Sequence, residues 1–200
     1  MLRPKLHRFS PTLVLVIANV AFYIYTSVLG RNFVVTASGV LTVYGLHSRA
    51  LLEGLWWQPV TSMFIHVNLA HIASNMLFLL IFGLRGEEFF TDSEYYSLYF
   101  VSGLAGNLLS LAYLFYPVPV TSAGASGAIF GVFGALVIFI RRVFGGSVTG
   151  ALIFAFLFFF ITLSSDTNFY AHFGGLTAGL AIGYMLADRR RAFLAHGLGI

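Results

Sequence analysis

The sequence Thr121-Ser122-Ala123-Gly124-Ala125-Ser126-Gly127-Ala128 is a short run of polar and small residues in a very apolar chain. It follows the turn Pro117-Val118-Pro119 and precedes an apolar stretch that extends to Ile140. One interpretation is that Ser126 caps the start of a helix, since serine is favoured at the N-cap position. The other is that its hydroxyl has a chemical role, because polar side chains within membrane helices are costly and usually functional.

The composition is that of a multi-pass membrane protein. Hydrophobic residues make up 58% of the 200 residues and charged residues 9%, whereas a soluble domain typically carries about 25% charged residues. The length suits a single bundle, so we expect one domain over residues 1–200. The chain has no cysteine, which excludes disulfides, thiolate chemistry and cysteine-based metal sites. We expect no metal or other cofactor.

Six apolar segments have lengths suited to membrane spans, given a bilayer core of about 30 Å and a helical rise of about 1.5 Å per residue. We therefore predict an all-α membrane protein built as a bundle of six transmembrane helices. The first segment is longer than the apolar core of a signal peptide and no clear cleavage site follows, so we predict an uncleaved helix. The predicted spans are residues 12–30, 69–84, 95–116, 126–140, 148–163 and 171–187.

A long connection, from Arg31 to His66, separates the first two spans. Loops of this length usually have a function or contain structure of their own. The adjacent Trp56 and Trp57 predict that the connection is seated at the membrane interface, where tryptophan is enriched. A surface loop with an aromatic anchor explains the same residues equally well.

Basic residues lie almost entirely on one side of the predicted bundle. Six spans put both termini on the same side, and the positive-inside rule places that side in the cytoplasm. Of the eleven lysines and arginines, only Arg31 and Arg49 lie on the opposite, external side. The net charge of +4 therefore orients the protein in a cell membrane, which we expect to be prokaryotic, and we expect no nucleic-acid partner. The cytoplasmic residues are Arg3, Lys5, Arg8, Arg85, Arg141, Arg142, Arg189, Arg190 and Arg191.

Three polar groups lie inside the predicted spans: His71 with Asn75 in the second, Ser126 in the fourth and His172 in the sixth. These spans run in the same direction, and each ends at a charged residue near the inner surface. His71, Ser126 and His172 precede those charged residues by 14, 15 and 16 positions. They therefore lie roughly 21, 22 and 24 Å above the inner interface, in one layer of the outer half of the membrane.

Small residues predict close contact between the fourth and sixth spans. Gly175 and Gly179 fall on the same helical stripe as His172, and the fourth span has a glycine series of its own that begins at Gly127. Spaced glycines allow two membrane helices to approach closely. Ser126 can then reach the histidine, although such a pattern often indicates helix packing alone.

Together these residues predict acyl-transfer chemistry. A serine hydroxyl becomes a strong nucleophile when a base, most often histidine, takes its proton. The tetrahedral intermediate needs hydrogen-bond donors for its oxyanion, and imidazoles, side-chain amides and the amides at a helix start can all serve. His71 and Asn75 would supply the first two, and the backbone amide of Ser126 the third. Each histidine alone is more often a packing residue.

Other chemistries fit the sequence less well. The histidines could hold a metal, but the H-E-x-x-H motif of zinc proteases is absent around His71. The G-x-S-x-G elbow of α/β-hydrolases is also absent, because residue 128 is alanine and no strand is predicted before Ser126. Asp166 could orient His172, although a solvated loop carboxylate at a helix entrance is the simpler interpretation.

These motifs resemble those of the rhomboid family of intramembrane serine proteases. The matching segments occur in the family's order and spacing, and they cover nearly the whole chain. They are His66-Val67-Asn68-Leu69-Ala70-His71-Ile72-Ala73-Ser74-Asn75, Gly124-Ala125-Ser126-Gly127 and Ala171-His172-Phe173-Gly174-Gly175, with Gly179.

The resemblance implies a role for each matching residue. Ser126 would be the nucleophile and His172 its base, working as a dyad. His71, Asn75 and the Ser126 backbone amide would form the oxyanion hole. His66 would have a structural role near the loop above the site. Supporting positions would be Gly124, Gly127, Phe130, Gly175 and Gly179.

Two positions differ from many family members. Gln58 follows Trp57 where arginine is usual, and Phe130 stands four residues after the nucleophile where tyrosine is usual. Phe130 would still stack on His172, but without a phenolic hydroxyl. Neither difference affects the predicted dyad.

The sequence thus predicts an endopeptidase that cuts transmembrane protein substrates near the outer face of the lipid bilayer. One rival is a non-catalytic membrane chaperone or dislocation factor of the same fold, which would lack the nucleophile or the base. Another is a transporter or channel, in which polar residues would line a path through the whole membrane. The natural substrate and the oligomeric state stay open.

A transmembrane substrate would have to enter sideways between two helices. The fifth span has no glycine after Ala151 and is rich in phenylalanine, so its packing would lose few close contacts on opening. We predict that this span and the loop from Ser164 to Asn168 form the lateral gate, held shut by Phe154, Phe156 and Phe158. The alternative is that these phenylalanines simply face lipid.

Overall fold

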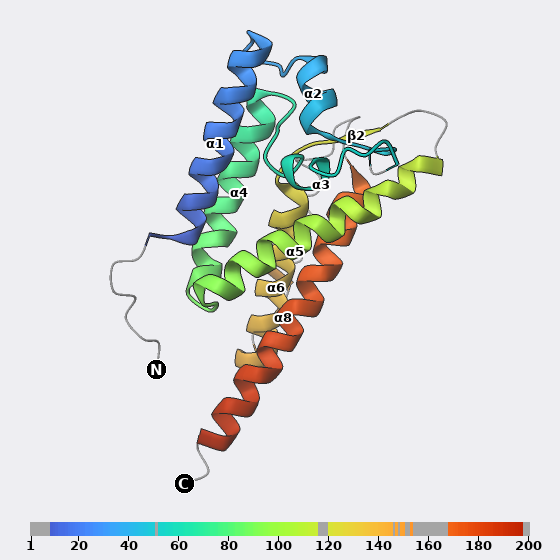
Figure 1. Cartoon of the computed structure of the whole chain (residues 1–200). Helices are drawn as coiled ribbons and strands as arrows, with labels where there is room; N and C mark the ends of the chain where they lie inside the picture. Colours follow the sequence, from blue (N-terminus) through green and yellow to red (C-terminus); the bar gives the residue numbers. More distant parts are fainter. Residues whose placement is uncertain are drawn as a thin grey trace.

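The computed structural model describes residues 9–50, 52–115, 120–145, 147, 149–150, 153 and 168–197. Within this part of the chain, five long helices form a bundle, and shorter elements gather at one end of it (Figure 1). The long helices are α1 (Pro11–Gly30), α4 (Leu69–Glu87), α5 (Asp92–Ser110), α6 (Ser126–Phe144) and α8 (Phe169–Gly197). The shorter elements are α2 (Ser38–Tyr44), β1 (Leu46–His47), α3 (Gln58–Thr61), the 3-10 helix η1 (Leu111–Phe115) and β2 (Thr121–Ser122).

Local sequence signals set where the long helices begin and end. The Ser10 side chain accepts a hydrogen bond from the Leu13 amide at the start of α1, which satisfies a donor that the helix leaves unpaired. Thr91 and Glu94 form a reciprocal capping box at the start of α5. Gly145 ends α6 with a left-handed φ of 70°, a conformation that favours glycine. These signals act within each helix and fix where it begins or ends.

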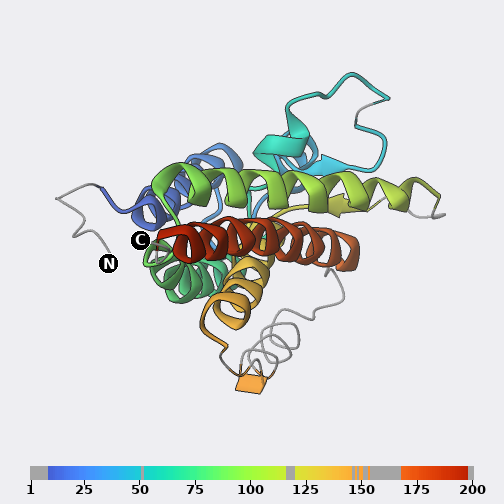
Figure 2. The same cartoon turned by 90° about the horizontal axis from the view of Figure 1, so that it is seen from below.

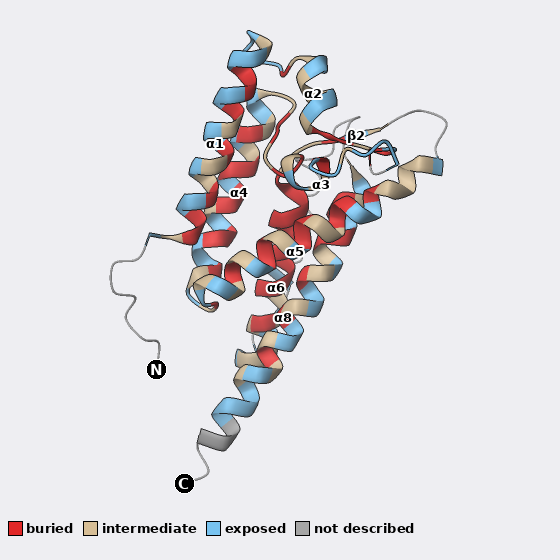
Figure 3. Cartoon of the chain, in the orientation of Figure 1, coloured by how far each residue is buried: buried red, intermediate tan, exposed pale blue. Residues whose placement is uncertain are grey.

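The central helix is α6, with 12 of its 19 residues buried (Figure 3). Seen along the bundle, α8 lies between α5 and α6 (Figure 2). Glycines make this close packing possible, because a Cβ on Gly175 would clash with the carbonyl oxygen of Gly127. A Cβ on Gly179 would likewise lie 2.5 Å from the Cα of Gly131. Backbone therefore packs on backbone along the α6–α8 contact.

The connection between α1 and α4 folds over the start of α6. Strand β1 pairs antiparallel with β2, with Leu46 opposite Ser122. Two residues later, the Gly124 amide donates a hydrogen bond of 2.8 Å to the carbonyl oxygen of Ser62. The segment that leads into α6 is therefore held by the connection on one side before the helix begins.

Gln58 lies inside this connection and bonds to its backbone. Its side chain is fully buried, its amide donates to the Thr42 carbonyl at 2.7 Å, and its oxygen accepts from the His47 amide at 2.9 Å. The neighbouring Trp57 indole donates to the Val43 carbonyl at 2.9 Å. The uncharged Gln58 side chain thus joins two parts of the connection by hydrogen bonds to backbone groups of Thr42 and His47.

The predicted membrane fold is confirmed at the level of a mostly helical, multi-pass protein. Among the described residues, four helices are long and apolar enough to cross a membrane: α1, α4, α5 with η1, and α6. Helix α8 covers the sixth predicted span and extends ten residues beyond it, to Gly197. The fifth predicted span, 148–163, lies outside the described residues apart from positions 149, 150 and 153. The count of six spans stays a prediction.

One expectation about local structure was wrong. We predicted no strand before Ser126, but β2 ends at Ser122, four residues upstream. Its pairing with β1 comes from a segment more than seventy residues away in the sequence. Two-residue strands of this kind have no alternation pattern of their own, which explains why the sequence does not indicate them.

Candidate active site

Three helices begin around one cavity, and each carries a candidate residue at or near its first turn. The Asn68 side chain accepts a 2.8 Å hydrogen bond from the amide of His71 and so caps α4. Asn168 accepts from the first turn of α8 in the same way, just before His172. Helix α6 begins at Ser126 itself. The three helix starts therefore bring these side chains to the same end of the bundle.

Ser126 and His172 are in direct contact. The His172 Nε2 and Ser126 Oγ atoms lie 2.7 Å apart, and the two side chains are only 5% and 6% exposed. The Phe130 ring packs on the imidazole, with ring centres 4.6 Å apart and planes at 33°. Ala125 is the N-cap residue of α6, so the interpretation of Ser126 as a helix cap is wrong. The serine hydroxyl is directed to the imidazole instead.

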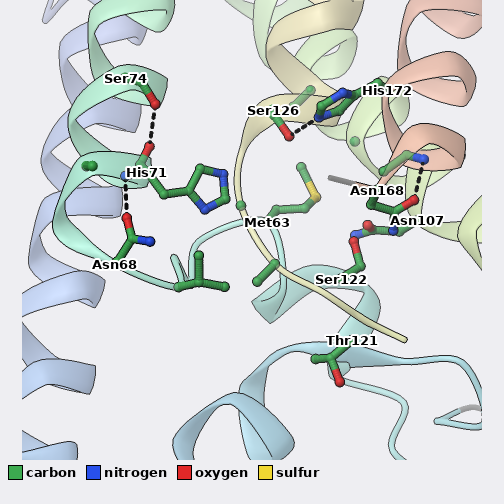
Figure 4. Close-up of a pocket in the computed structure, with 18 residues that line it drawn as sticks. Met63, Asn68, His71, Ser74, Asn107, Thr121, Ser122, Ser126, Asn168 and His172 are labelled. Atoms are coloured by element: carbon green, nitrogen blue, oxygen red, sulfur yellow. Dashed lines mark hydrogen bonds between the residues drawn. The ribbon is translucent and has the colours of Figure 1, made fainter. Parts of the chain in front are cut away.

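A cavity of about 420 Å³ lies beside this pair (Figure 4). Its walls include Ser126, His172 and His71. The His71 ring lies against Gly124, where an added Cβ would be 2.7 Å from Cε1 and 2.9 Å from Nε2. Gly124 also has a φ of +117°, so both its backbone conformation and the space beside it require glycine.

The His71 imidazole forms part of the cavity wall. Its ring reaches from α4 toward Ser126 (Figure 4). Within the described part of the chain, its Nδ1 atom has no hydrogen-bond partner. This nitrogen can donate or accept a hydrogen bond, according to which ring nitrogen carries the proton.

Asn75 lies one helical turn behind His71. Its amide donates a 2.8 Å hydrogen bond to the carbonyl oxygen of His71, and its side chain is fully buried. It is not among the described residues that line the cavity. The structure thus brings Ser126, His172 and His71 together and sets Asn75 behind them.

His66 anchors the residue before Ser126. Its Nδ1 lies 3.1 Å from the carbonyl oxygen of Phe64, and its Nε2 accepts from the amide of Ala125 at 3.5 Å. A neutral imidazole protonated on Nδ1 satisfies both contacts. Complete burial, with a smaller contribution from the nearby His71, lowers the pKa of His66 to about 3. His66 is therefore neutral near pH 7 and acts through hydrogen bonds.

Several cavity residues were missed in the sequence. Asn107 is the clearest, because its amide donates to the Pro59 carbonyl at 2.7 Å and to the Ser62 hydroxyl at 2.8 Å. Its place in the third predicted span was an available signal, since an amide inside a membrane helix is costly. Ser122 also lines the cavity; it lies in the polar run before α6, but we predicted no role for it from the sequence. Met63 lines the cavity from the segment after α3, where no sequence pattern marks it.

Two predictions fall on residues that the structure does not describe. Asp166 is one of them, so its suggested role in orienting His172 has no structural counterpart here. The other is the lateral gate, since Phe154, Phe156, Phe158 and the loop before Asn168 all lie outside the described ranges.

The site is chemically equipped to activate a hydroxyl. The imidazole is at hydrogen-bond distance from the hydroxyl, as proton removal by a base requires. The start of a helix presents unpaired amides and a partial positive charge, which favour an anion. The fold and site thus define a class: a multi-pass membrane protein with a serine–histidine pair in a cavity between its helices.

Comparison with known proteins gives the family. A family model described as the Rhomboid domain matches residues 53–189. The chain therefore belongs to the rhomboid family, and the resemblance seen in the sequence is confirmed.

Curated relatives share about a third of the aligned residues. The chain is 28% identical over 177 residues to Rhomboid-like protease 3 of Toxoplasma gondii, covering 83% of this chain and 65% of the relative. It is 31% identical over 153 residues to Rhomboid protease GluP of Bacillus subtilis, and this alignment covers 72% of this chain and 29% of the relative. It is 34% identical over 141 residues to RHOMBOID-like protein 1 of Arabidopsis thaliana, and this alignment covers 66% of this chain and 35% of the relative. The chain thus spans less than two thirds of each of these relatives, which come from bacteria and eukaryotes alike.

Proposed function

We propose that this chain is an intramembrane serine endopeptidase in which Ser126 and His172 form a catalytic dyad. The observation that carries the proposal is the 2.7 Å contact between the Ser126 hydroxyl and the His172 Nε2, at a cavity wall in a membrane bundle. Membership of the rhomboid family, with relatives named as proteases, supports the same assignment.

The first half of the reaction forms an acyl-enzyme. The Ser126 Oγ attacks the carbonyl carbon of the scissile peptide bond while the His172 Nε2 takes the hydroxyl proton. The carbonyl oxygen becomes an oxyanion, which the His71 imidazole and the Ser126 backbone amide stabilise, with Asn75 as a third candidate donor. The carbon–nitrogen bond then breaks, and His172 returns its proton to the leaving amine.

The second half of the reaction requires water. A water molecule attacks the ester carbonyl, His172 takes the water proton, and the Ser126 hydroxyl is restored as the carboxyl product leaves. Asn68, Asn107 and Ser122 among the cavity walls support water there, since buried water needs polar partners. An aqueous cavity in an apolar bundle is what hydrolysis inside a membrane demands.

The proposed substrates are transmembrane proteins cut near the outer membrane face. A peptide bond in a helix is already hydrogen-bonded and shielded, so the substrate must unwind locally before Ser126 can reach it. Small or helix-breaking residues near the cut would assist this step. The proposed topology is a single domain of six spans with both termini in the cytoplasm.

An active-site probe tests the proposal directly. Purified protein in detergent is treated with a fluorophosphonate, and cleavage of a transmembrane substrate is measured in parallel. Wild type should be labelled and active, whereas Ser126→Ala should be neither. His172→Ala should also lose both. Ser74→Ala is the matched control, because Ser74 lines the same cavity but donates to a carbonyl of its own helix.

The outcomes separate the proposal from its rival. Cleavage by Ser126→Ala at the wild-type rate would remove Ser126 as the nucleophile. A folded wild-type protein that neither reacts with the probe nor cleaves any substrate would instead indicate a non-catalytic membrane chaperone.

A further inference from the structure

Met63 contributes a flexible apolar side chain to the active-site cavity. It follows α3, is 2% exposed, and lines the same cavity as Ser126 and His172. In Figure 4 its thioether is drawn on the Ser126 side of the cavity, away from the His71 ring. Methionine is unbranched and adapts its shape to what it contacts, so its end can form a deformable wall.

The end of Met63 rests on a glycine. A Cβ built on Gly103 of α5 would lie 2.9 Å from the Met63 sulfur and would clash with its terminal methyl carbon. The same Cβ would be 3.2 Å from the Cβ of Ala128 on α6, so helix α6 closes the other side. The missing side chain at position 103 thus provides the space in which the thioether lies. Filling that space would push the thioether toward the cavity.

The cavity wall near the serine is otherwise built from small residues. Gly124, Gly127, Ala128 and Ala171 line the same cavity as Ser126 and contribute at most a methyl group each. Met63 is the largest aliphatic side chain among the described residues that line the cavity. A substrate side chain next to the scissile carbonyl must occupy space continuous with Ser126, and Met63 is the largest apolar side chain that it would meet there.

We propose that Met63, packed against Gly103, determines how large a side chain the enzyme accepts at the residue that supplies the scissile carbonyl. This inference rests on the proposed protease function. It assigns the size selectivity of the substrate site to Met63, which follows α3, and to Gly103 of α5, against which Met63 packs.

Two substitutions should shift selectivity in opposite directions. The substrates are otherwise identical transmembrane peptides with alanine, valine, leucine or phenylalanine before the scissile bond. Met63→Ala should raise kcat/KM for the leucine and phenylalanine peptides, relative to the alanine peptide, by about tenfold or more, the range expected for added pocket volume. Gly103→Ala should lower the valine-to-alanine ratio, because the displaced thioether narrows the cavity.

A matched control separates selectivity from stability. Met76→Ala also truncates a buried methionine, but Met76 is not among the described residues lining the cavity. It should lower thermal stability and leave the ratios between peptides unchanged. If Met63→Ala does not fold, Gly103→Ala decides the question, because it adds only one methyl group against a flexible neighbour.

The results discriminate between the two proposals. Unchanged ratios in folded, probe-labelled variants would overturn the role of Met63 while leaving the protease function intact. Absence of both probe labelling and cleavage in wild type would overturn the protease function and this inference with it.

Discussion

Ser126 is the first residue of α6 and follows the N-cap residue by one position. An N-cap side chain folds back on the amides of its own helix, whereas the Ser126 side chain is directed to His172 on α8. That offset of one residue leaves the hydroxyl available to His172, at 2.7 Å. Phe130, one turn further along α6, packs on the imidazole and restricts its orientation.

The oxyanion donors should differ in importance. His71→Ala should lower kcat about 10²–10³-fold, because it removes a donor that lines the cavity. Asn75→Ala should have a smaller effect, since Asn75 lies behind His71 and bonds to its carbonyl oxygen. Steady-state kinetics with one transmembrane substrate measures both. If Asn75→Ala is the more damaging change, Asn75 is the principal donor and the ranking is reversed.

The burial of His66 predicts a loss of stability in acid. The unfolded chain binds a proton on this histidine near pH 6.5, but the folded protein does not until about pH 3. The unfolded state therefore gains protons first, and the free energy of unfolding falls as the pH drops from about 6.5 to 3, by up to about 1.4 kcal/mol per pH unit. Above pH 6.5 this contribution is constant.

His66→Gln isolates that contribution. Glutamine keeps one donor and one acceptor for Phe64 and Ala125 but does not ionise in this range. Melting temperatures in detergent should fall less steeply between pH 6 and pH 4 in the variant than in wild type. Parallel curves for the two proteins would show that His66 is not the titrating group.

At the scale of elements, the contact between α6 and α8 joins the two halves of the proposed dyad. These helices approach through backbone at Gly127 and Gly131 on one side and Gly175 and Gly179 on the other. An added Cβ at Gly175 or Gly179 would clash with the backbone of α6 and force the two helices apart, whereas at Gly131 it would clash with Ser102 of α5. The separation of Ser126 and His172 therefore depends on residues up to two turns away from the site.

Gly179→Ala should lower both activity and thermal stability. Even one methyl group would clash with the carbonyl oxygen of Gly131, and the helix backbones cannot yield cheaply. Cleavage rate and melting temperature should fall together. Gly39→Ala in α2 is the control, since an added Cβ there meets nothing within 4 Å. Full activity and an unchanged melting temperature in Gly179→Ala would contradict the close packing of the two helices.

At the scale of the whole molecule, the helix starts at α4, α6 and α8 define one end and the basic residues the other. Arg142 joins the C-terminal part of α6 to α8, with its Nε 3.2 Å from the Asp188 carboxylate and its guanidinium over the Tyr184 ring at 3.8 Å. The Ser126–His172 contact and this ion pair thus join the same two helices near opposite ends of α6.

The predicted orientation can be tested by labelling, because the chain has no cysteine. Glu53 in the connection before α3 and Arg191 near the end of α8 are both exposed. In intact cells, a membrane-impermeant maleimide should label Glu53→Cys and not Arg191→Cys. Permeabilised cells should label both and serve as the control. Labelling of Arg191→Cys in intact cells would place the C-terminal end outside and refute the positive-inside assignment.

The sequence by itself determined the membrane class, the approximate spans and the family. Local patterns indicate these features: the lengths of the apolar segments, the basic residues at span ends, and the short motifs around Ser126, His71 and His172. Such patterns depend only on neighbouring residues, so they can be seen without a fold. The lateral gate and the count of six spans remain predictions from those patterns.

Only the tertiary structure decided how the site is completed. The contacts that complete the site join residues that are distant in the chain: Ser62 with Gly124, His66 with Ala125, and Gly103 with Met63. No local pattern specifies such pairs, because each depends on which helix faces pack together and how closely. The position of Asn75 behind His71 has the same origin, since the fold decides which side chains of one helix face the cavity.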